Sequence, residues 1–422
     1  MGRLACGFPR RETRSTFREM VEGLLMGLDV VNCWTLAEAI GHLSPARLQH
    51  LLSRASWDDQ GVLDAAARWA ATQLDDGDAV LIADETGDAK ASKNAVGSGY
   101  QHSGSLGGVG LCQVAVHLAY ATTRGHTILD RALYLPRDWA ADDERRQRAG
   151  VPDEFTFTAK PALAAGLLTR ARAAGIGAAY FTADEVYGSR ALRRTCRELG
   201  LGYAIAVRSN HKVATPGADM TCKNALAKIP GRAWNRMQTG TGTKGVRDYD
   251  WAMIEVLADD NPAGHEPGAS VLLARRHRYT RTVSFFRCWT PAPVTLVKLV
   301  WVVCQRWKIE EDFQASKNAT GLDKGQVSTW MSWHRWSAAT LVAYAFITVA
   351  TALERQDPDP GEVGLIAFTC HELLRLLRVL VIPQRNQDPA HVSHWSWWRR
   401  RHQFVAQACH IQWNAYADST PS

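Results

Sequence analysis

The sequence has no Cys-x-x-Cys pair, although it contains nine cysteines. Structural zinc sites and small disulfide frameworks depend on closely spaced cysteines, so scattered ones argue against both. The beginning of the chain also has no apolar core behind its first positive residues of the kind that signal peptides carry. Reduced thiols in the cytoplasm are therefore the simplest expectation.

Long, predominantly apolar runs are also nearly missing. The exception is residues 336–353, which contain no charged side chain. About 18 residues is the lower edge of what spans a bilayer, and this run is rich in Ala and Thr and has no second one beside it. A buried core helix is the expected outcome.

The chain is long and mildly basic. It has 422 residues and a formal net charge of +7, with a pI of about 9.0. Its apolar and charged fractions are those of a globular protein with more than one domain. A basic balance suits a polyanionic partner such as DNA, although many unrelated proteins are mildly basic too.

Two apolar runs each end on an aspartate. Residues 79–84 end at Asp84, and residues 178–184 end at Asp184. Short apolar runs bounded by turn residues predict buried strands, and an acid at the carboxyl end of a strand lies where open α/β sheets bind ligands. Taken singly, each aspartate could equally be a turn or helix-cap residue.

A charged helix is predicted over residues 306–317. Arg306, Glu310 and Lys317 are four and seven residues apart, so they share one side of it. A carboxylate can hold a divalent metal, and flanking cations can hold phosphates. An ordinary surface helix with ion pairs is the alternative. Together with the two aspartates, Glu310 could complete a site for two metal ions, which is a known route to phosphodiester cleavage.

The three segments together resemble the DDE transposases of bacterial insertion sequences. The resemblance rests on three motifs in this order: Ile82-Ala-Asp84-Glu-Thr-Gly87, Thr182-Ala-Asp184-Glu-Val-Tyr-Gly188 and Arg306-Trp-Lys-Ile-Glu310-Glu-Asp-Phe-Gln314-Ala-Ser-Lys317. Further similar stretches are Tyr100-Gln-His-Ser-Gly104, Asp130-Arg-Ala-Leu-Tyr-Leu-Pro136, Lys160-Pro161 and Gly321-Leu-Asp-Lys-Gly-Gln326. The likeness covers about residues 15 to 345.

The resemblance implies both a fold and a reaction. The fold would be α/β: a ribonuclease-H-like mixed sheet with flanking helices, a helical N-terminal domain and a mostly β insertion. Asp84, Asp184 and Glu310 would bind two Mg²⁺ ions, with Mn²⁺ as a substitute, and catalyse DNA cleavage and strand transfer. The partner would be double-stranded DNA, namely transposon ends and target, bound by a homodimer of a cytoplasmic, nucleoid-associated protein.

Two adjacent glutamates compete for the third acidic place. The family has its glutamate four residues after an arginine and seven before a lysine, and only Glu310 satisfies both spacings. Glu311 is about 100° further round the helix and should point elsewhere. The family often has a tyrosine where this chain has Val303, which leaves a role for that tyrosine in doubt.

Changes of pattern along the chain divide it into five parts. They are a helical DNA-binding domain (1–75), the first part of the catalytic core (76–207), a β-rich insertion (208–293), the second part of the core (294–355) and a helical basic C-terminal region (356–422). The long separation of Asp184 from Glu310 requires such an insertion, because a minimal α/β unit needs only a short link.

Several other residues are candidates for contacting DNA. Beside Arg306 and Lys317, which would fix phosphates, they are Arg47 in a helix-turn-helix-like segment, Lys90 and Lys93 in a Gly-containing loop, and Arg399 and Arg400 in a Trp-rich tail. An ordinary helical hairpin, a solvated hairpin end and a helix docked through its Trp residues are the respective alternatives. Candidates for stacking on an unpaired base are Trp234, Trp251 and Trp289, although a core position is favoured for each.

Two other functions remain open at this point. A decayed or domesticated relative would bind DNA without cutting it, and the intact acidic triad speaks against that. A metal nuclease of the same fold would cut DNA without joining the ends to a target.

Overall fold

The protein is described by a computed structural model that covers residues 2–242, 245–356, 365–382 and 388–419. Its α-helices are α1 (Arg11–Leu25), α2 (Cys33–Ala39), α3 (Ala46–Ser53), α4 (Asp59–Leu74), α5 (Arg137–Ala140), α6 (Asp143–Ala149), α7 (Lys160–Ala173), α8 (Arg190–Glu198), α9 (Cys222–Leu226), α10 (Leu296–Gln305), α11 (Trp307–Thr320), α12 (Trp330–Gln356), α13 (Cys370–Leu380) and α14 (Pro389–Ser419). Its strands are β1 (Val80–Ala89), β2 (Ser98–Ser103), β3 (Gly108–Ala121), β4 (His126–Leu133), β5 (Tyr180–Ala183), β6 (Gly202–Val207), β7 (Lys212–Thr215), β8 (Ala218–Thr221), β9 (Asn235–Gly242), β10 (Gly245–Glu255), β11 (Ala269–His277) and β12 (Val283–Thr290).

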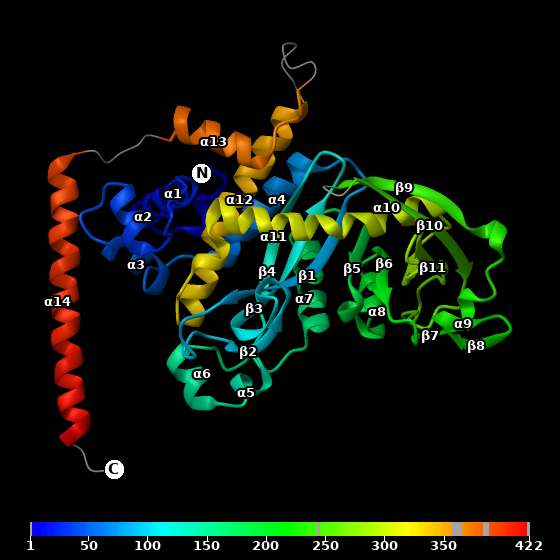
Figure 1. Ribbon diagram of the computed structural model, residues 1–422, viewed down its shortest axis with the longest axis horizontal. Helices are drawn as coiled ribbons and strands as arrows, with labels where there is room; N and C mark the ends of the chain where they lie inside the picture. The colour runs from blue at the N-terminus through cyan, green and yellow to red at the C-terminus, as the bar shows by residue number, and fades with distance from the viewer. Residues whose placement is uncertain (1, 243–244, 357–364, 383–387, 420–422) are drawn as a thin grey trace.

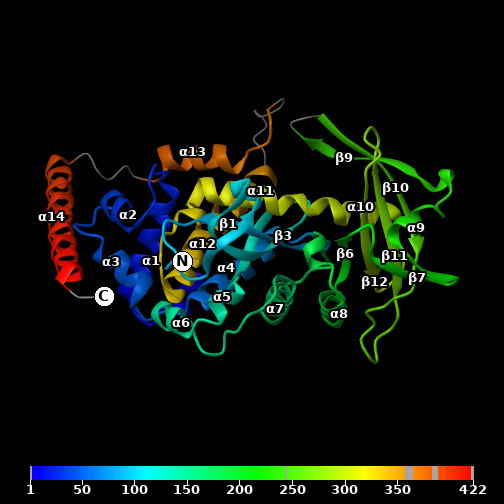
Figure 2. The ribbon, with the colours of Figure 1, turned by 60° about the horizontal axis from the view of Figure 1, so that its bottom comes forward.

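One mixed sheet of ten strands forms the centre of the molecule (Figures 1 and 2). Its order is β2-β3-β1-β5-β6-β12-β11-β10-β9, with β4 paired to β3. β1, β5 and β6 are parallel, and β3 runs antiparallel between β1 and β4. The predicted fold class, a ribonuclease-H-like mixed sheet flanked by helices, is confirmed.

Alternate side chains of β1 enter two different layers of core. Leu81 and Ala83 pack with α7 and α8 on one face, whereas Val80 and Ile82 pack with α10, α11 and α12 on the other. This follows from the two-residue period of a strand. The same alternation continues past Ile82 and decides which way each acidic side chain of β1 points.

Most of the predicted insertion does not form a sheet of its own, and only β7 and β8 pair as a separate two-stranded sheet. β12 pairs with β6, with Phe285 opposite Val207, and β11, β10 and β9 follow outward, so these strands extend the central sheet. β7, β8 and α9 share a small separate core with one face of this extension. Figure 1 shows the extension at the right of the molecule, away from the N-terminal helices.

The N-terminal helices share their hydrophobic core with the catalytic part of the chain. Phe17 of α1, Leu48 of α3 and Val62 of α4 belong to the same buried cluster as Ile309 of α11 and Leu341 of α12. The helical region therefore packs directly on the helices that cover the sheet.

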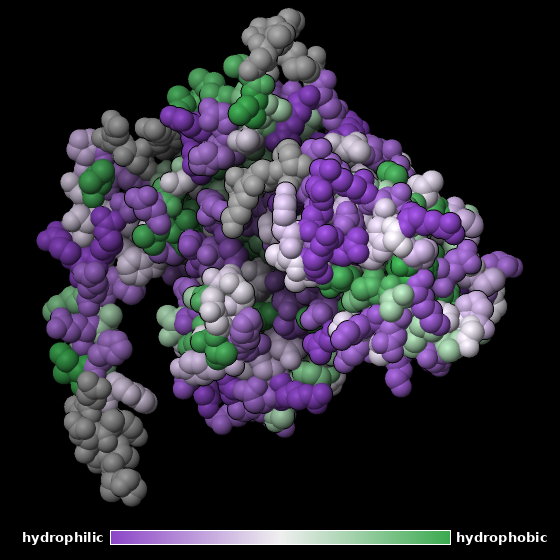
Figure 3. Space-filling view, turned by 45° about the vertical axis from the view of Figure 1, so that its right-hand side comes forward, coloured by the Kyte–Doolittle hydropathy of each residue, from purple (hydrophilic) through white to green (hydrophobic). Residues whose placement is uncertain are grey.

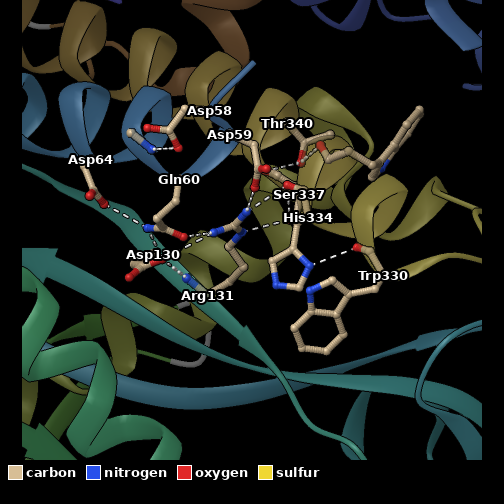
Figure 4. Close-up of polar contacts among 12 residues, drawn as sticks. Asp58, Asp59, Gln60, Asp64, Asp130, Arg131, Trp330, His334, Ser337 and Thr340 are labelled. Atoms are coloured by element: carbon tan, nitrogen blue, oxygen red, sulfur yellow. Dashed lines mark hydrogen bonds and ion pairs between the residues drawn. The ribbon is translucent and has the colours of Figure 1, made fainter. Parts of the chain in front are cut away.

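A buried arginine ties these layers together (Figure 4). The side chain of Arg131 on β4 is fully buried. Its guanidinium donates to Ser337 Oγ (2.9 Å) and the His334 carbonyl (2.8 Å) on α12, and to Gln60 Oε1 (2.6 Å) on α4. Asp59 Oδ2 lies 3.2 Å away and compensates the charge. A buried guanidinium is tolerated only when its donors are satisfied, so this residue fixes β4, α4 and α12 in one arrangement.

The long uncharged run forms α12. It is long and apolar enough to cross a membrane, but 83% of its apolar window is buried inside the protein. The expected buried core helix is confirmed.

The predicted charged helix is α11, which begins at Trp307, one residue later than predicted. α10 precedes α11 directly, and the two lie end to end across the sheet (Figures 1 and 2). Arg306 is the junction between them, where its backbone N–H donates to Val303 O at 3.2 Å, a three-residue contact that interrupts the α-helical pattern. Gly321 ends α11 in the left-handed conformation, with φ 67°.

An ionic cluster on β4 holds the middle of α11. His126 Nδ1 lies 2.8 Å from Asp312 Oδ1, and Nε2 lies 3.4 Å from Glu311 Oε2. The Tyr344 hydroxyl of α12 donates to the same Asp312 oxygen at 2.6 Å. Burial disfavours the charged imidazole, but Asp312 and Glu311 outweigh it and raise the pKa of His126 to about 9. The imidazolium therefore compensates a carboxylate that is wholly buried.

The first prediction concerns the pH dependence that this cluster confers. The folded pKa of His126 is above its ordinary 6.5, so its stabilisation is full below about pH 6.5 and is lost as the pH rises through about 9. We expect His126→Gln to lower the free energy of unfolding by about 3 kcal/mol near pH 6, because Asp312 loses its cation. At about pH 9.5 the difference from wild type should shrink strongly, as measured by urea unfolding at both pH values. The exposed His102, changed to Gln, is the control, and an equal deficit at both pH values would contradict the assignment.

Candidate active site

Parallel pairing of β1 with β5 brings the two aspartates together. Ala83 pairs with Ala183, and Asp84 and Asp184 are the next residues of the two strands. Both follow residues that face α7 and α8, so both side chains lie on the opposite face, toward α10 and α11. The sequence prediction that two strands would deliver these acids to one place agrees with this arrangement.

The surroundings of the two aspartates favour the protonated form of each. Burial raises the pKa of Asp84 to about 7, with Arg306 opposing the rise and the charges of Asp184 and Glu85 adding to it. Burial also raises the pKa of Asp184, against a hydrogen bond from the backbone N–H of Val186 (2.8 Å). Two neighbouring carboxylates whose pKa values are both raised, mainly by burial, form a site that gains from a bound cation.

Arg306 connects the third acid to the first. Its Nη2 donates to Glu310 Oε1 at 2.6 Å, and its Nη1 lies 3.3 Å from Asp84 Oδ2. Glu310 is about one-third exposed, whereas Asp84 is 15% exposed. The predicted row of Arg306 and Glu310 on one side of the helix therefore faces Asp84, which lies within β1, since this strand continues past it to Ala89.

The donor atoms of this site suit a hard divalent cation. Asp84, Asp184 and Glu310 offer only carboxylate oxygens, the ligands that Mg²⁺ and Mn²⁺ prefer. Among the residues that the structure describes, no three acidic, His or Cys side chains converge closely enough to hold a metal as they stand. At this site the guanidinium of Arg306 contacts both Asp84 and Glu310. The three acids are suitable ligands by type, but the Arg306 side chain stands between Glu310 and Asp84.

Glu85 was quoted within a motif but received no role from the sequence. It points to the α7 face, where its Oε1 lies 2.7 Å from Lys160 Nζ and its Oε2 accepts from the Tyr187 hydroxyl at 2.5 Å. Burial, followed by the charge of Glu85, raises the pKa of Tyr187, so its hydroxyl stays a donor. The sequence did contain a signal for this role of Glu85. Strand alternation places Glu85 on the other face of β1 from Asp84, and Lys160 and Tyr187 both belong to the stretches that resemble the family.

Lys317 contacts the strand rather than open solvent. Its ammonium donates to Thr86 Oγ1 (2.7 Å) and to the Gly87 carbonyl (3.3 Å), and it lies 3.0 Å from Asp88 Oδ1. Its side chain is 16% exposed. In this arrangement Lys317 fixes β1 against α11, although the sequence indicated a phosphate contact.

Lys90 differs more clearly from its expected place. It is buried, and its ammonium donates to the Gly325 carbonyl at 2.5 Å. The expected DNA-holding loop therefore lacks this charge, because the Lys90 side chain turns inward to the loop after α11. Burial lowers the pKa of Lys90, and the charge of Asp88 opposes that shift. Lys93 of the same loop is exposed, with its ammonium 5.5 Å from the centre of the Tyr100 ring.

Glu311 lies away from the aspartates. Its carboxylate contacts His126 and Lys308, and its pKa falls to about 2, with the hydrogen bond from His126 as the main cause. Val303, at the place where the family often has a tyrosine, is buried in the main core.

The remaining candidates are distributed over the surface and the core. Arg47 is half exposed and donates to Thr16 Oγ1 at 3.0 Å. Arg399 lies 2.6 Å from Glu38, whereas Arg400 is exposed. Trp251 and Trp289 are buried, and Trp234 is half-buried beneath the guanidinium of Arg276.

Trp289 in particular lies far from the acids along the strands. It pairs with Tyr203 near the start of β6, at the opposite end from Val207. Its indole N–H donates to the Pro267 carbonyl at 2.8 Å. Trp289 is therefore part of the core, as the alternative interpretation had it.

The second prediction concerns Glu85. Glu85→Gln keeps the size of the side chain but leaves Lys160 without its anion, so we expect a loss of about 1–3 kcal/mol in the free energy of unfolding. DNA cleavage should fall as well, because Glu85 fixes the strand that carries Asp84. Glu185→Gln is the matched control, since Glu185 is half exposed and only 3.6 Å from Arg208; it should change stability by less than about 0.5 kcal/mol. Equal effects of the two substitutions in urea unfolding would show that Glu85 has no such role.

The relationship to known proteins agrees with this geometry. Residues 3–241 match the profile of the DDE superfamily endonucleases, and residues 158–346 match that of the transposase DDE domain. A probable transposase for insertion sequence element IS701, from Microchaete diplosiphon, is 28% identical over 209 residues, or 49% of this chain. The match spans 52% of that relative's length. The family profile covers more than half of the chain, so this protein belongs to the DDE superfamily of endonucleases and transposases.

Proposed function

We propose that this protein is the transposase of an insertion sequence, which binds the terminal inverted repeats of its element, cuts the DNA there and joins the cut end to a target. Asp84, Asp184 and Glu310 are the catalytic acids. The observation that carries the proposal is the parallel pairing of β1 and β5, which places two aspartates side by side, with Glu310 joined to the first of them through Arg306.

The three acids act as ligands for two Mg²⁺ ions, with Mn²⁺ as a substitute. When bound, the ions supply Lewis acidity that activates the attacking oxygen and stabilises the leaving 3′ oxygen. The protein's part is to hold its carboxylates on a rigid strand pair and on a helix whose middle and later parts are fixed by His126 and Lys317. No residue is required to form a covalent bond with DNA. Arg306, which stands beside Glu310 and Asp84, positions a phosphate next to the bond that is cut.

Four arginines near the outer end of the sheet support a DNA path leading to these acids. Arg236 and Arg278 pair with Asp248, and Arg276 and Arg281 pair with Asp250. Four cations on two anions leave a net positive surface. The turn between β11 and β12 (278–282) lies beyond Phe285 and Val207, at the end of the sheet where Asp184 follows β5. Tyr279 in this turn is 86% exposed.

A second positive surface lies at the other side of the molecule. α14 docks on α2 and the turn after it: the indole of Trp395 donates to the His42 carbonyl at 2.9 Å, and Trp398 packs edge-on against Trp34. Figure 3 shows α14 as a column beside the body, mostly polar with scattered apolar patches. We propose that Arg400, together with Arg399 and the exposed Arg47, contacts the inverted repeat, because α14 and α3 belong to one assembly of helices.

The proposed DNA substrate also bears on the oligomeric state and the cellular location of the protein. A protein that cuts both ends of an element acts as at least two copies on DNA, so we propose a homodimer on paired ends. We also propose that it works in the bacterial cytoplasm, on the nucleoid.

The third prediction tests the acids. Asp84→Ala, Asp184→Ala and Glu310→Gln should each abolish Mg²⁺-dependent cleavage of a labelled fragment carrying the element's own end, because each removes a ligand. Each should leave binding of that fragment largely intact in a gel-shift assay.

Glu311→Gln is the control for this series, since Glu311 lies against His126 and Lys308, and its effect on cleavage should be far milder. Equal losses in Glu311→Gln and Glu310→Gln would contradict the choice of the third acid. Specific binding by the wild type with no cut in Mg²⁺ or Mn²⁺ would identify a DNA-binding relative. Cutting without joining to a target would identify a nuclease.

The fourth prediction tests the arginines of the β11–β12 turn. The double substitution Arg278→Gln and Arg281→Gln should weaken DNA binding and reduce the salt dependence of log K by up to about 1.8, since each phosphate contact contributes about 0.9. The control removes the same charge from the opposite face of the sheet, through Arg172→Gln and Arg194→Gln on the exposed surfaces of α7 and α8. Fluorescence anisotropy over a range of salt concentrations measures both slopes. The assignment fails if the two double variants lose the same amount.

A further inference from the structure

The position of Arg306 is unusual for a residue whose role is to contact a phosphate. Both of its terminal nitrogens are directed at carboxylates, Nη2 to Glu310 (2.6 Å) and Nη1 to Asp84 (3.3 Å). The guanidinium is only about one-quarter exposed. A planar fork with two ends matches two carboxylates well, and this geometry makes charge-assisted hydrogen bonds comparatively strong.

The same two oxygens are the ones a divalent cation would need. Asp84 Oδ2 and Glu310 Oε1 are bound to Arg306, and Asp184, the remaining acid, has its Oδ1 occupied by the backbone N–H of Val186. A guanidinium and a metal ion cannot both lie between Asp84 and Glu310, since each would bring a positive charge to the same lone pairs.

The neighbouring cations do not share this arrangement. Lys317 is held by β1, Lys160 by Glu85 on the opposite face, and Lys308 by Glu311. Arg275 of β11 comes close enough to oppose the charge of Arg306, and the Arg247 guanidinium lies 4.8 Å from the Trp307 ring. Repulsion from Arg275 on one side and attraction to two acids on the other keep the guanidinium of Arg306 directed toward the acids.

We propose that Arg306 is an internal cation that competes with the divalent metal for Asp84 and Glu310, and that loading of the site releases its guanidinium to a DNA phosphate. This rests on the proposed function, since it requires these acids to be metal ligands. One residue thereby holds the acids together before loading and is a phosphate ligand afterwards. Metal occupancy and DNA contact are then linked through a single side chain.

The Arg306 side chain is about one-quarter exposed, so it lies at a solvent-accessible edge of the site. Its backbone is helical (φ −52°, ψ −35°), so the change that we propose involves the side chain alone. α11 itself is fixed further along, by His126 at Asp312 and by β1 at Lys317. A change in the direction of the Arg306 side chain therefore need not move Glu310 away from β1.

The test measures metal affinity without DNA and without turnover. Binding of Mn²⁺ to the full chain is followed by electron paramagnetic resonance of the free ion, and binding of Ca²⁺ by calorimetry. Arg306→Gln removes the competing cation, so we expect it to bind Mn²⁺ at least about fivefold more tightly than wild type, the effect of one unit charge removed from about 4 Å in a water-exposed site. Arg306→Lys keeps the charge but not the two-ended fork, and its affinity should fall between the two.

Lys308→Gln is the matched control, because it removes the same charge two residues along the chain without touching Asp84 or Glu310. It should leave Mn²⁺ affinity within about twofold of wild type. Equal or weaker binding in Arg306→Gln, with binding retained in wild type, would overturn the competition while leaving the metal site intact. A gain of the same size in Lys308→Gln would reduce the effect to net charge and would also overturn it. Absence of binding in all chains, the wild type included, would remove the metal site itself and the inference with it.

Thermal unfolding supplies a second readout that does not depend on cleavage. Without divalent ions, Arg306→Gln should melt below wild type, since Asp84 and Glu310 lose their shared counter-charge. Saturating Ca²⁺ should raise its Tm by more than it raises that of wild type. An equal rise in the two chains would contradict the proposal, and Arg306→Lys serves the same comparison if Arg306→Gln folds poorly.

Discussion

The parallel pairing of β1 with β5 is the constraint on which the rest of this structure depends. It places Asp84, within β1, beside Asp184, which directly follows β5. Both are partly withdrawn from water, burial raises the pKa of each, and the charge of Asp184 adds to the rise at Asp84. Such a pair is unfavourable by itself, because like charges in a partly buried place repel one another. Each surrounding cation lies on the face of the strand that carries the acid it compensates.

β1 distributes its charges by alternation. Glu85 points to one face and meets Lys160, whereas Asp84 and Asp88 point to the other and meet Arg306 and Lys317. Three cations, from α7, the α10–α11 junction and α11, thus compensate three acids of one strand. Placing three acids in one strand is costly, since each ion pair must repay the loss of hydration. Proteins accept such local costs where a function needs them.

Much of this could be predicted from the sequence, because the informative signals are local. Apolar runs before Asp84 and Asp184 marked the strands, and the spacing of Arg306, Glu310 and Lys317 marked one side of a helix. What the sequence did not determine were the partners across the fold. The ammonium of Lys90 turns inward because a carbonyl at Gly325, 235 residues away, accepts from it. The pairing of β12 with β6 likewise depends on a sheet edge that no local pattern specifies.

α11 is anchored along its middle and later parts, whereas the Arg306 side chain before it is partly exposed. One part of the helix is fixed by a buried ionic cluster, in which Asp312 is held by His126 and by the Tyr344 hydroxyl. Its later part is fixed by Lys317 on β1. Only its beginning, at Arg306, is both interrupted in backbone pattern and partly open to solvent. Rigid anchoring therefore sets where Glu310 lies. In the exchange that we propose, only the partners of the Arg306 guanidinium change when a cation and a phosphate arrive, so no moving loop is required.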